Sequence, residues 1–350
     1  MDDLSLREAN LAVGNPATAP GLECTSTGPT LRFSHPTVIC LTGAVTDATL
    51  DAVPVPMWQP VEVPAGATLD VGAATTQGMR VYLAIRGGFD EPTYLGSVST
   101  FTLGRFGGHE GRALLPGDVL RPGSEPDSPV GGPTPPERRP ALTNSWRIGV
   151  TEGPHAAPEF FTHDDIETLF GTDYTVHFNS ARTGVRLIGP HPHWAREDGG
   201  EAGLHPSNIH DTPYSVGALD FTGDTPIILG PDGPSLGGFT CPAVVASSEL
   251  WKVGQLRPED TVRFVPVGEG ATEDLRARCS SVSVLRSGDG DDGVIARRDG
   301  GPRPSRRHLP PQRRLQSAGR VRRSGARHRP ADAHPRPAGR RAVCPSARAD

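Results

Sequence analysis

Short apolar runs separated by turn residues are the dominant pattern of this chain. Between Thr30 and Leu120 the runs often alternate apolar with polar positions and recur roughly every 8–12 residues, which is typical of a β-barrel or β-sandwich. The strands that we predict here are 30–33, 37–43, 55–58, 61–63, 68–71, 80–88 and 117–120. The first part of the chain is therefore predicted to be a β-rich lobe.

A different pattern precedes these strands. Residues 2–13 fit a short helix, with Asp2 or Asp3 as its N-cap and Gly14 as its stop. The apolar positions that we expect on the buried side of this helix are Leu4, Leu6 and Leu11.

A second β-rich lobe follows a polar connection. Residues 121–142 are rich in Pro and too polar to form a core, so they are predicted to be a linker. Beyond it, Thr162 and Asp165 predict a capping box for a second short helix. The strands predicted around that helix are 146–150, 174–178, 185–189, 214–221, 226–230, 243–246 and 261–265. We therefore expect a mainly β chain with lobes at 1–120 and 143–278.

The C-terminal residues 279–350 differ in composition from the rest. They hold 17 Arg and 6 Asp, and no aromatic residue follows Phe264. A basic nucleic-acid arm, a disordered tail and a product of a slipped reading frame all fit this composition. We expect a disordered, dispensable tail and rank a slipped frame ahead of a basic arm.

Several classes of protein are excluded or disfavoured by composition. The five cysteines are scattered and odd in number, which argues against a disulfide framework. The N-terminus is acidic and no apolar run reaches 18 residues, so we expect a cytoplasmic protein without a membrane partner. No nucleotide-binding motif and no Met-Lys-Met biotinylation motif is present, so we expect neither an ATP site nor attached biotin in this chain.

The richest candidate chemistry lies in residues 182–239, where Gly, Pro, His, Asp and Asn are concentrated. His205, Asn208, His210 and Asp211 fall within seven residues, interrupted by a proline, and are expected on a loop. Two imidazoles, an amide and a carboxylate suit the binding of a planar, amide-like substrate and the transfer of a proton. The alternative is a polar loop whose Asn and Asp only satisfy turn backbone.

Two further groups in this block have alternative interpretations. His191 and His193 form an H-x-H pair that, with the nearby histidines, fits a metal site, although a surface turn explains it equally well and we predict no metal. Asp224 follows a strand and is a candidate general base, or else a turn residue bonding its own backbone. The Gly-rich residues 230–239 lack a phosphate-loop ending and instead favour close approach by a flat ligand or another strand.

Three residues complete the predicted site as substrate-binding groups. Lys252 is the only lysine and suits a carboxylate or carbonyl, although a solvated lysine is the common alternative. Arg182 suits bidentate carboxylate binding, as does Arg186, although surface arginines are commoner. Tyr214 is the third member of the substrate-binding set.

Several motifs resemble one family. They are G-N-P at 14–16, A-I-R-G-G at 84–88, L-G-S-V-S-T-F at 95–101, F-G-G-H-E-G-R at 106–112, the 182–239 block and L-W-K-V-G-Q-L-R-P-E-D at 250–260. Over roughly residues 1–266 the chain is similar to the carboxyltransferase domain of biotin-dependent urea carboxylase, the allophanate hydrolase subunit 2 family. The resemblance implies cyclophilin-like β-barrel lobes and transfer of a carboxyl group from carboxybiotin to urea, giving allophanate.

The resemblance also implies partners. Carboxybiotin would come from separate biotin carboxylase and biotin carrier domains, and a second carboxyltransferase lobe would complete the site. Relative to the family, we expect the first strands to be missing and the second lobe to be absent or out of frame. Residues 307–316, re-read in another frame with chosen codons, give V-T-Y-R-R-S-G-D-Y, which resembles the start of the next family module. A 5-oxoprolinase-type subunit and a non-catalytic, partner-binding regulatory subunit remain as alternatives.

Overall fold

The computed structural model describes residues 1–268 of the chain. Contacts divide the chain into two units, Met1–Gly290 and Asp291–Asp350, and the second unit lies wholly outside the described residues. The predictions for the tail at 279–350, including disorder and the slipped frame, therefore concern residues that are not described.

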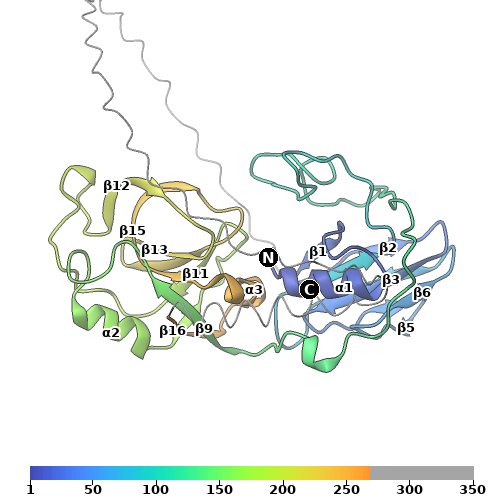
Figure 1. Ribbon diagram of the computed structural model, residues 1–350, viewed down its shortest axis with the longest axis horizontal. Coiled ribbons are helices and arrows are strands. Elements are labelled where there is room, and N and C mark those ends of the chain that lie inside the picture. The colour runs from blue at the N-terminus through green and yellow to red at the C-terminus, as the bar shows by residue number, and fades with distance from the viewer. Residues whose placement is uncertain (269–350) are drawn as a thin grey trace, which may run out of the picture. The chain divides into compact units, whose positions relative to one another are not determined.

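The N-terminal lobe contains two four-stranded sheets around one core (Figure 1). The first sheet has the order β1-β8-β3-β6 and the second the order β2-β7-β4-β5. The bounds are α1 Asp3–Ala12, β1 Leu22–Thr25, β2 Thr30–Arg32, β3 Thr37–Gly43, β4 Thr49–Leu50, β5 Val53–Pro54, β6 Val61–Val63, β7 Thr68–Asp70 and β8 Arg80–Ile85. Buried side chains from β3, β6, β7 and β8 share the core, so the two sheets enclose it between them.

Helix α1 begins and ends as predicted, but its buried side was predicted wrongly. The carboxylate of Asp2 accepts the backbone N–H of Ser5 and caps the helix. Leu4, Leu6 and Leu11 are only partly buried. The buried side chains are small or polar ones: Ser5, Glu8, Ala9, Asn10 and Ala12. The alanines pack against Cys40 and Ala84 of β3 and β8, and a helix lying this close to a sheet favours small side chains at the contact.

The C-terminal lobe is a closed seven-stranded barrel. Its strands pair in the order β9-β15-β13-β14-β11-β10-β16, and β16 pairs with β9 in parallel to close the ring. The bounds are β9 Ser145–Glu152, α2 His163–Gly171, β10 Tyr174–Val176, β11 Gly184–Ile188, β12 Asn208–Pro213, β13 Ala218–Thr222, β14 Thr225–Leu229, β15 Leu236–Val245, α3 Leu250–Gln255 and β16 Thr261–Pro266. Strand β12 pairs with β15 outside this ring. Short 3-10 turns lie at Pro136–Arg138, Gly200–Ala202 and Ser247–Glu249.

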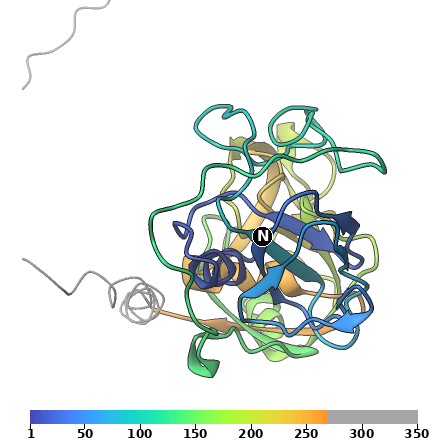
Figure 2. The same cartoon turned by 90° about the vertical axis from the view of Figure 1, so that its right-hand side faces the viewer.

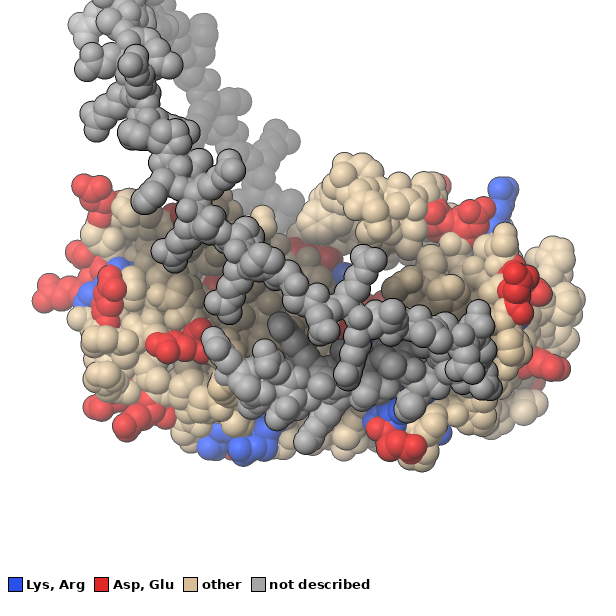
Figure 3. All heavy atoms as spheres, viewed as in Figure 1, with Lys and Arg blue, Asp and Glu red and all other residues tan. Residues whose placement is uncertain are grey.

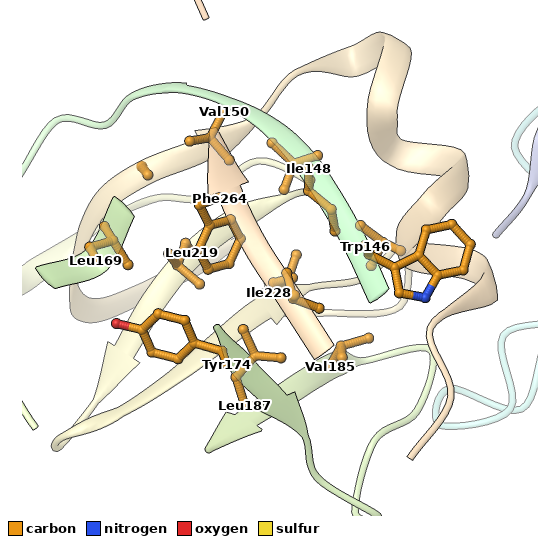
Figure 4. Packing of buried hydrophobic residues seen from close by; sticks show 14 of the residues in the cluster. Trp146, Ile148, Val150, Leu169, Tyr174, Val185, Leu187, Leu219, Ile228 and Phe264 are labelled. Atoms are coloured by element: carbon orange, nitrogen blue, oxygen red, sulfur yellow. The ribbon is translucent and has the colours of Figure 1, made fainter. Parts of the chain in front are cut away.

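Alternate residues of the barrel strands fill the barrel interior (Figure 4). On β13, Leu219 and Phe221 belong to this core, whereas Ala218 belongs to a separate small cluster with Cys241 of β15. Because successive strand side chains point to opposite faces, Asp220 lies on the outer face, between the two core residues. This alternation places the polar side chains of β11, β13 and β14 outside the barrel.

Two predicted strands are wrong. Residues 55–58 form a turn in which Trp58 has φ 65° and donates its N–H to Leu41 O at 2.7 Å. Residues 117–120 belong to a long excursion, residues 90–120, that contains isolated bridges but no regular strand (Figures 1 and 2). There the carboxylate of Asp118 pairs with Arg112 at 2.6 Å and accepts the N–H of Leu115, which favours a polar turn over a strand.

The predicted linker connects the two lobes and is attached to the first. Arg86 donates to the carbonyl oxygens of Pro126 and Ser128, and Arg138 pairs with Glu8 of α1 at 2.6 Å. The segment forms no core of its own, and backbone hydrogen bonds and ion pairs hold it against the N-terminal lobe.

The lobes are also joined by a buried polar contact. Gln255 at the end of α3 accepts the N–H groups of Met79 and Arg80, each at 3.0 Å, and donates to Asp2 at 2.8 Å. The guanidinium of Arg80 donates to Gly254 O. Because every atom of Gln255 is buried, these bonds fix the approach of α3 to β8.

The predicted fold class is confirmed for the described residues: a mainly β chain of two cyclophilin-like lobes with three short α-helices. Acidic side chains outnumber basic ones on the visible face in Figure 3, which agrees with the excess of Asp and Glu before the tail. None of the helices in residues 1–268 is long and apolar enough to span a membrane.

Candidate functional site

Three connections on the outside of the barrel bring most of the site together. The β13–β14 turn carries Asp224, the turn after β11 carries His191 and Trp194, and the segment before β12 carries His205. Gly223 has φ 62° in the first of these turns, a conformation that glycine adopts without strain. The three connections are far apart in the sequence and meet at the carboxylate of Asp224.

The N-cap of α2 fixes the turn that carries His191 and Trp194. The predicted capping box is confirmed, with Thr162 and Asp165 exchanging hydrogen bonds. The carboxylate of Asp165 also accepts the N–H groups of His193 at 2.8 Å and Trp194 at 3.1 Å. Burial alone would raise the pKa of Asp165, but these hydrogen bonds outweigh it and lower the pKa. A charged Asp165 therefore holds the H-P-H turn in place.

Asp224 is the centre of the cluster. Trp194 Nε1 donates to Asp224 Oδ1 at 2.9 Å, His191 Nδ1 lies 3.3 Å from Oδ2, and His205 Nε2 lies 3.6 Å from Oδ1. The Asp224 side chain is 35% exposed, so a small molecule can reach it. We call these four residues the Asp224 cluster. Asp224 does more than satisfy its own turn, because its carboxylate is oriented by a tryptophan 30 residues away.

The tautomer of His205 follows from its partners. The backbone N–H of Ser207 donates to His205 Nδ1 at 3.1 Å, so the neutral ring carries its proton on Nε2, which faces Asp224. Ser207 is fully buried, and its hydroxyl lies 3.0 Å from the same nitrogen and accepts the N–H of Gly223. Ser207 therefore ties the His205 segment to the turn that carries Asp224.

Asn208 is half-buried beside this segment and begins β12. Its Oδ1 accepts the N–H of His205 at 3.1 Å, and its own N–H donates to His205 O at 2.9 Å. No partner within residues 1–268 accepts from the Asn208 amide nitrogen. Within the described part of the chain, the Asn208 oxygen is therefore committed to the fold and the amide nitrogen is free.

The predicted loop is wrong for three of its four residues, because Asn208, His210 and Asp211 lie in β12. The pairing of β12 with β15 is irregular between Asn208 and Thr212, which face Phe239 and Gly237, so the intervening residues form a bulge. His210 and Asp211 are exposed there, and no hydrogen bond or ion pair in the described chain joins them to Asp224. The structure therefore places His205 beside Asp224 and Asn208 against the backbone of His205, with His210 and Asp211 farther along the same edge strand.

Gly237 and Gly238, within the Gly-rich residues 230–239, allow close approach of β12 and Tyr214 to β15. A methyl group on Gly238 would lie 2.7 Å from Ile209 O of β12, and one on Gly237 would lie 2.5 Å from the Tyr214 ring. Tyr214 Oη accepts the N–H of Phe239 at 2.6 Å, and burial raises the pKa of Tyr214 to about 12. Tyr214 is therefore held against β15.

The other two predicted substrate-binding residues have protein partners. Arg182 pairs with Glu23 of β1 at 2.6 Å and with Asp232 at 2.8 Å, so it links the lobes. Lys252 on α3 pairs with Glu249 and donates to Arg147 O. Neither cation contacts the Asp224 cluster within the described part of the chain.

Asp220 is a buried acid on β13, four residues before Asp224. It is 2% exposed, and its Oδ1 has no hydrogen-bond partner within residues 1–268. Burial raises the pKa of Asp220 to about 7, against the lowering effect of hydrogen bonds from Cys241 and Tyr214. Between the unfolded pKa, near 4, and this value, the folded chain binds a proton that the unfolded chain does not.

We therefore expect Asp220→Asn to stabilise the fold, and increasingly so as the pH rises from 4 to 7. Wild-type stability is lost across this window because the folded chain must keep Asp220 protonated or bury its charge, at a cost of roughly 4 kcal/mol above pH 7. Guanidinium chloride unfolding at pH 4.5 and pH 8 measures the difference. The control is Asp51→Asn, an exposed turn residue. A stability difference that does not change with pH would contradict the prediction.

No group of three or more His, Cys, Asp or Glu in residues 1–268 is arranged to hold a metal ion. His191 and His193 instead contact different carboxylates, those of Asp224 and Asp165. The two histidines of the H-x-H pair lie in one turn, and their rings point to different carboxylates.

The outside of the closed barrel thus carries a carboxylate oriented by a tryptophan and faced by an imidazole. A family model described as "Carboxyltransferase domain, subdomain A and B" matches residues 1–266, and the chain belongs to this family. The resemblance seen in the motifs is thereby confirmed.

Several known proteins are similar over most of the chain. Urea amidolyase of Saccharomyces cerevisiae is 51% identical over 79% of this chain and 15% of its own length. The crystal structure of Kluyveromyces lactis urea carboxylase has a TM-score of 0.77 and 50% identity, covering 80% of this chain and 26% of its own. A 5-oxoprolinase subunit of Escherichia coli is 30% identical over 79% of this chain and 84% of its own length. The chain thus spans about a sixth to a quarter of the urea-processing relatives named here.

Proposed function

We propose that this chain is the carboxyltransferase part of a biotin-dependent urea carboxylase, passing a carboxyl group from carboxybiotin to a urea nitrogen to give allophanate. The observation that carries the proposal is the partly exposed carboxylate of Asp224, oriented by Trp194 and facing His205. The approximately 50% identity to urea carboxylase and urea amidolyase supports urea as the acceptor.

The chain must hold the urea nitrogen, accept its proton and stabilise the negative charge that develops on the urea oxygen. A urea nitrogen is a poor nucleophile, so its N–H must be held and its proton accepted as the new N–C bond forms. In the proposal Asp224 accepts that proton, His205 Nε2 steadies the carboxylate, and the free amide of Asn208 donates to the urea oxygen. Carboxybiotin, when bound, would supply the carboxyl group, and the proton that Asp224 accepts from urea would pass to the biotin nitrogen that loses the carboxyl group.

The chain needs partners for this role. A hollow of about 460 Å³ adjoins Asp224, which is room for urea and a second small group together. We propose that separate biotin carboxylase and carrier domains deliver carboxybiotin and that a second carboxyltransferase lobe completes the site. We also propose that the reaction takes place in the cytoplasm, with no nucleic acid or membrane taking part.

The test is reconstitution. The full chain is combined with a biotin carboxylase, a carrier domain, the second lobe of a urea carboxylase, ATP, bicarbonate and urea, and allophanate is measured. We expect allophanate only when the chain is present, and the chain with free carboxybiotin tests activity without partners. Carboxylation of the carrier without allophanate would contradict the proposal and favour a regulatory subunit.

A 5-oxoprolinase-type subunit is the second candidate. The observation in its favour is that the chain spans 84% of the E. coli 5-oxoprolinase subunit, far more than it spans of the urea enzymes. Replacing urea with 5-oxoproline in an assembly completed with the other 5-oxoprolinase subunits tests it. Turnover of 5-oxoproline and none of urea would favour this candidate.

A further inference from the structure

The hollow beside Asp224 lies on the outer face of the barrel and carries charge of both signs. Its lining includes His177, Asn179, Arg186, His191 and Asp224. Val185 and Leu187 of β11 belong to the barrel core, so Arg186 between them points outward. The hollow thus has a cation on β11 and the carboxylate of Asp224 at the start of β14.

Arg186 is held by its backbone, and its guanidinium has no hydrogen-bond or ion-pair partner among residues 1–268. Its N–H donates to Ser180 Oγ at 3.1 Å, and its carbonyl accepts the N–H of His177 at 2.9 Å. Among residues 1–268 no carboxylate pairs with the guanidinium. Arg263, another outward-facing arginine of the barrel, pairs with Asp173 at 2.6 Å. An arginine whose backbone is fixed and whose guanidinium pairs with no described carboxylate, at the edge of a hollow, is available to an anionic ligand.

His177 supplies a second donor in the same hollow. The N–H of Asn179 donates to His177 Nδ1 at 3.0 Å, so the neutral ring carries its proton on Nε2. The ring packs against Phe178, with centroids 4.2 Å apart, which restricts its rotation. The hollow therefore offers donors from Arg186 and His177 and an acceptor from Asp224.

We propose that this hollow binds a small molecule with a carboxylate at one end and amide N–H groups at the other. The carboxylate contacts Arg186 and His177, and the N–H groups contact Asp224. The inference rests on the proposed function and deepens it, because N-carboxylated urea has both ends whereas urea has only the second. Arg186 thus interacts with a charge that the acceptor gains during transfer, which favours the product and the transition state over urea.

Calorimetric titration of the full chain with allophanate and with biuret tests the proposal. Biuret is allophanate with an amide in place of the carboxylate, so the pair isolates the charge. We expect allophanate to bind more tightly, and Arg186→Gln to weaken it by about tenfold or more while leaving biuret unchanged. Arg147→Gln, a matched exposed arginine on β9, should change neither affinity.

Equal affinities for allophanate and biuret, or an Arg186→Gln chain that binds allophanate like the wild type, would overturn the proposal. So would inorganic phosphate that competes with allophanate at the same affinity, because the hollow would then be a general anion site. Transfer to urea without carboxylate-selective binding would leave the proposed function intact and refute the hollow as its product site. Carboxylate-selective binding without transfer would refute the proposed function alone.

Discussion

Asp224→Asn should lower carboxyl transfer to urea by roughly 10²–10⁴-fold, the range that positioned general bases contribute. The amide is nearly the same size as the carboxylate, and its oxygen can still accept from Trp194 Nε1, which lies 2.9 Å from the native oxygen. The substitution therefore removes the charge and the proton acceptor while preserving the turn. Allophanate formation in the reconstituted assembly measures the effect.

Two comparisons separate a chemical role for Asp224 from a structural one. Carboxylation of the carrier domain should be unchanged, because it does not use this lobe, and Asp173→Asn on the same barrel should leave transfer unchanged. Trp194→Phe keeps the carboxylate but removes its donor, so we expect a smaller loss of about tenfold from misorientation. If Asp224→Asn kept carboxyl transfer within a few-fold of the wild type, a group other than Asp224 would accept the proton of the urea nitrogen.

The strands that pack into the barrel were predictable because their pattern is local. The runs at 146–150, 185–189 and 261–265 each coincide with an observed strand to within two residues, and the cap at Thr162 was confirmed. Alternation reports directly which side of a strand is buried. The order of the strands and the closure of β16 on β9 depend on pairing between distant segments, which no local pattern records.

The errors share a physical cause. β12 contains Pro213 and a bulge, and only Ile209 among its first residues is strongly apolar, so it reads as a loop although β15 pairs with it. On α1 the leucines suggested the buried side, yet close packing on the sheet selected alanine and hydrogen-bonded polar side chains. In both places tertiary contact outweighed local preference.

The candidate site was predicted in composition but not in geometry. His205, Asn208 and Asp224 were singled out from residue type; the structure places His205 3.6 Å from Asp224 and bonds Asn208 to the backbone of His205. Trp194 and Ser207 were missed as partners because their hydrogen bonds span 30 and 16 residues. Arg182 was predicted to bind substrate because arginine suits a carboxylate, but in the fold its guanidinium pairs with Glu23 and Asp232.

Asn208→Ala should lower transfer by about 10²-fold, the usual cost of losing one donor to a developing negative charge. This substitution alone is ambiguous, because Asn208 Oδ1 also accepts the N–H of His205 at 3.1 Å. Asn208→Asp resolves the ambiguity, since the carboxylate still accepts that N–H but cannot donate. The two variants separate the oxygen of the side chain, which accepts the N–H of His205, from its nitrogen, which we propose donates to the substrate.

We expect Asn208→Asp to lose transfer as severely as Asn208→Ala while keeping the stability of the wild type. Loss of the acceptor should cost Asn208→Ala about 1 kcal/mol in the free energy of unfolding, measured in guanidinium chloride. If Asn208→Asp kept wild-type transfer, the amide nitrogen would have no role and the residue would act only through the turn of His205. Equal loss in both variants, with stability lost in only one, would identify Asn208 as a donor to the substrate.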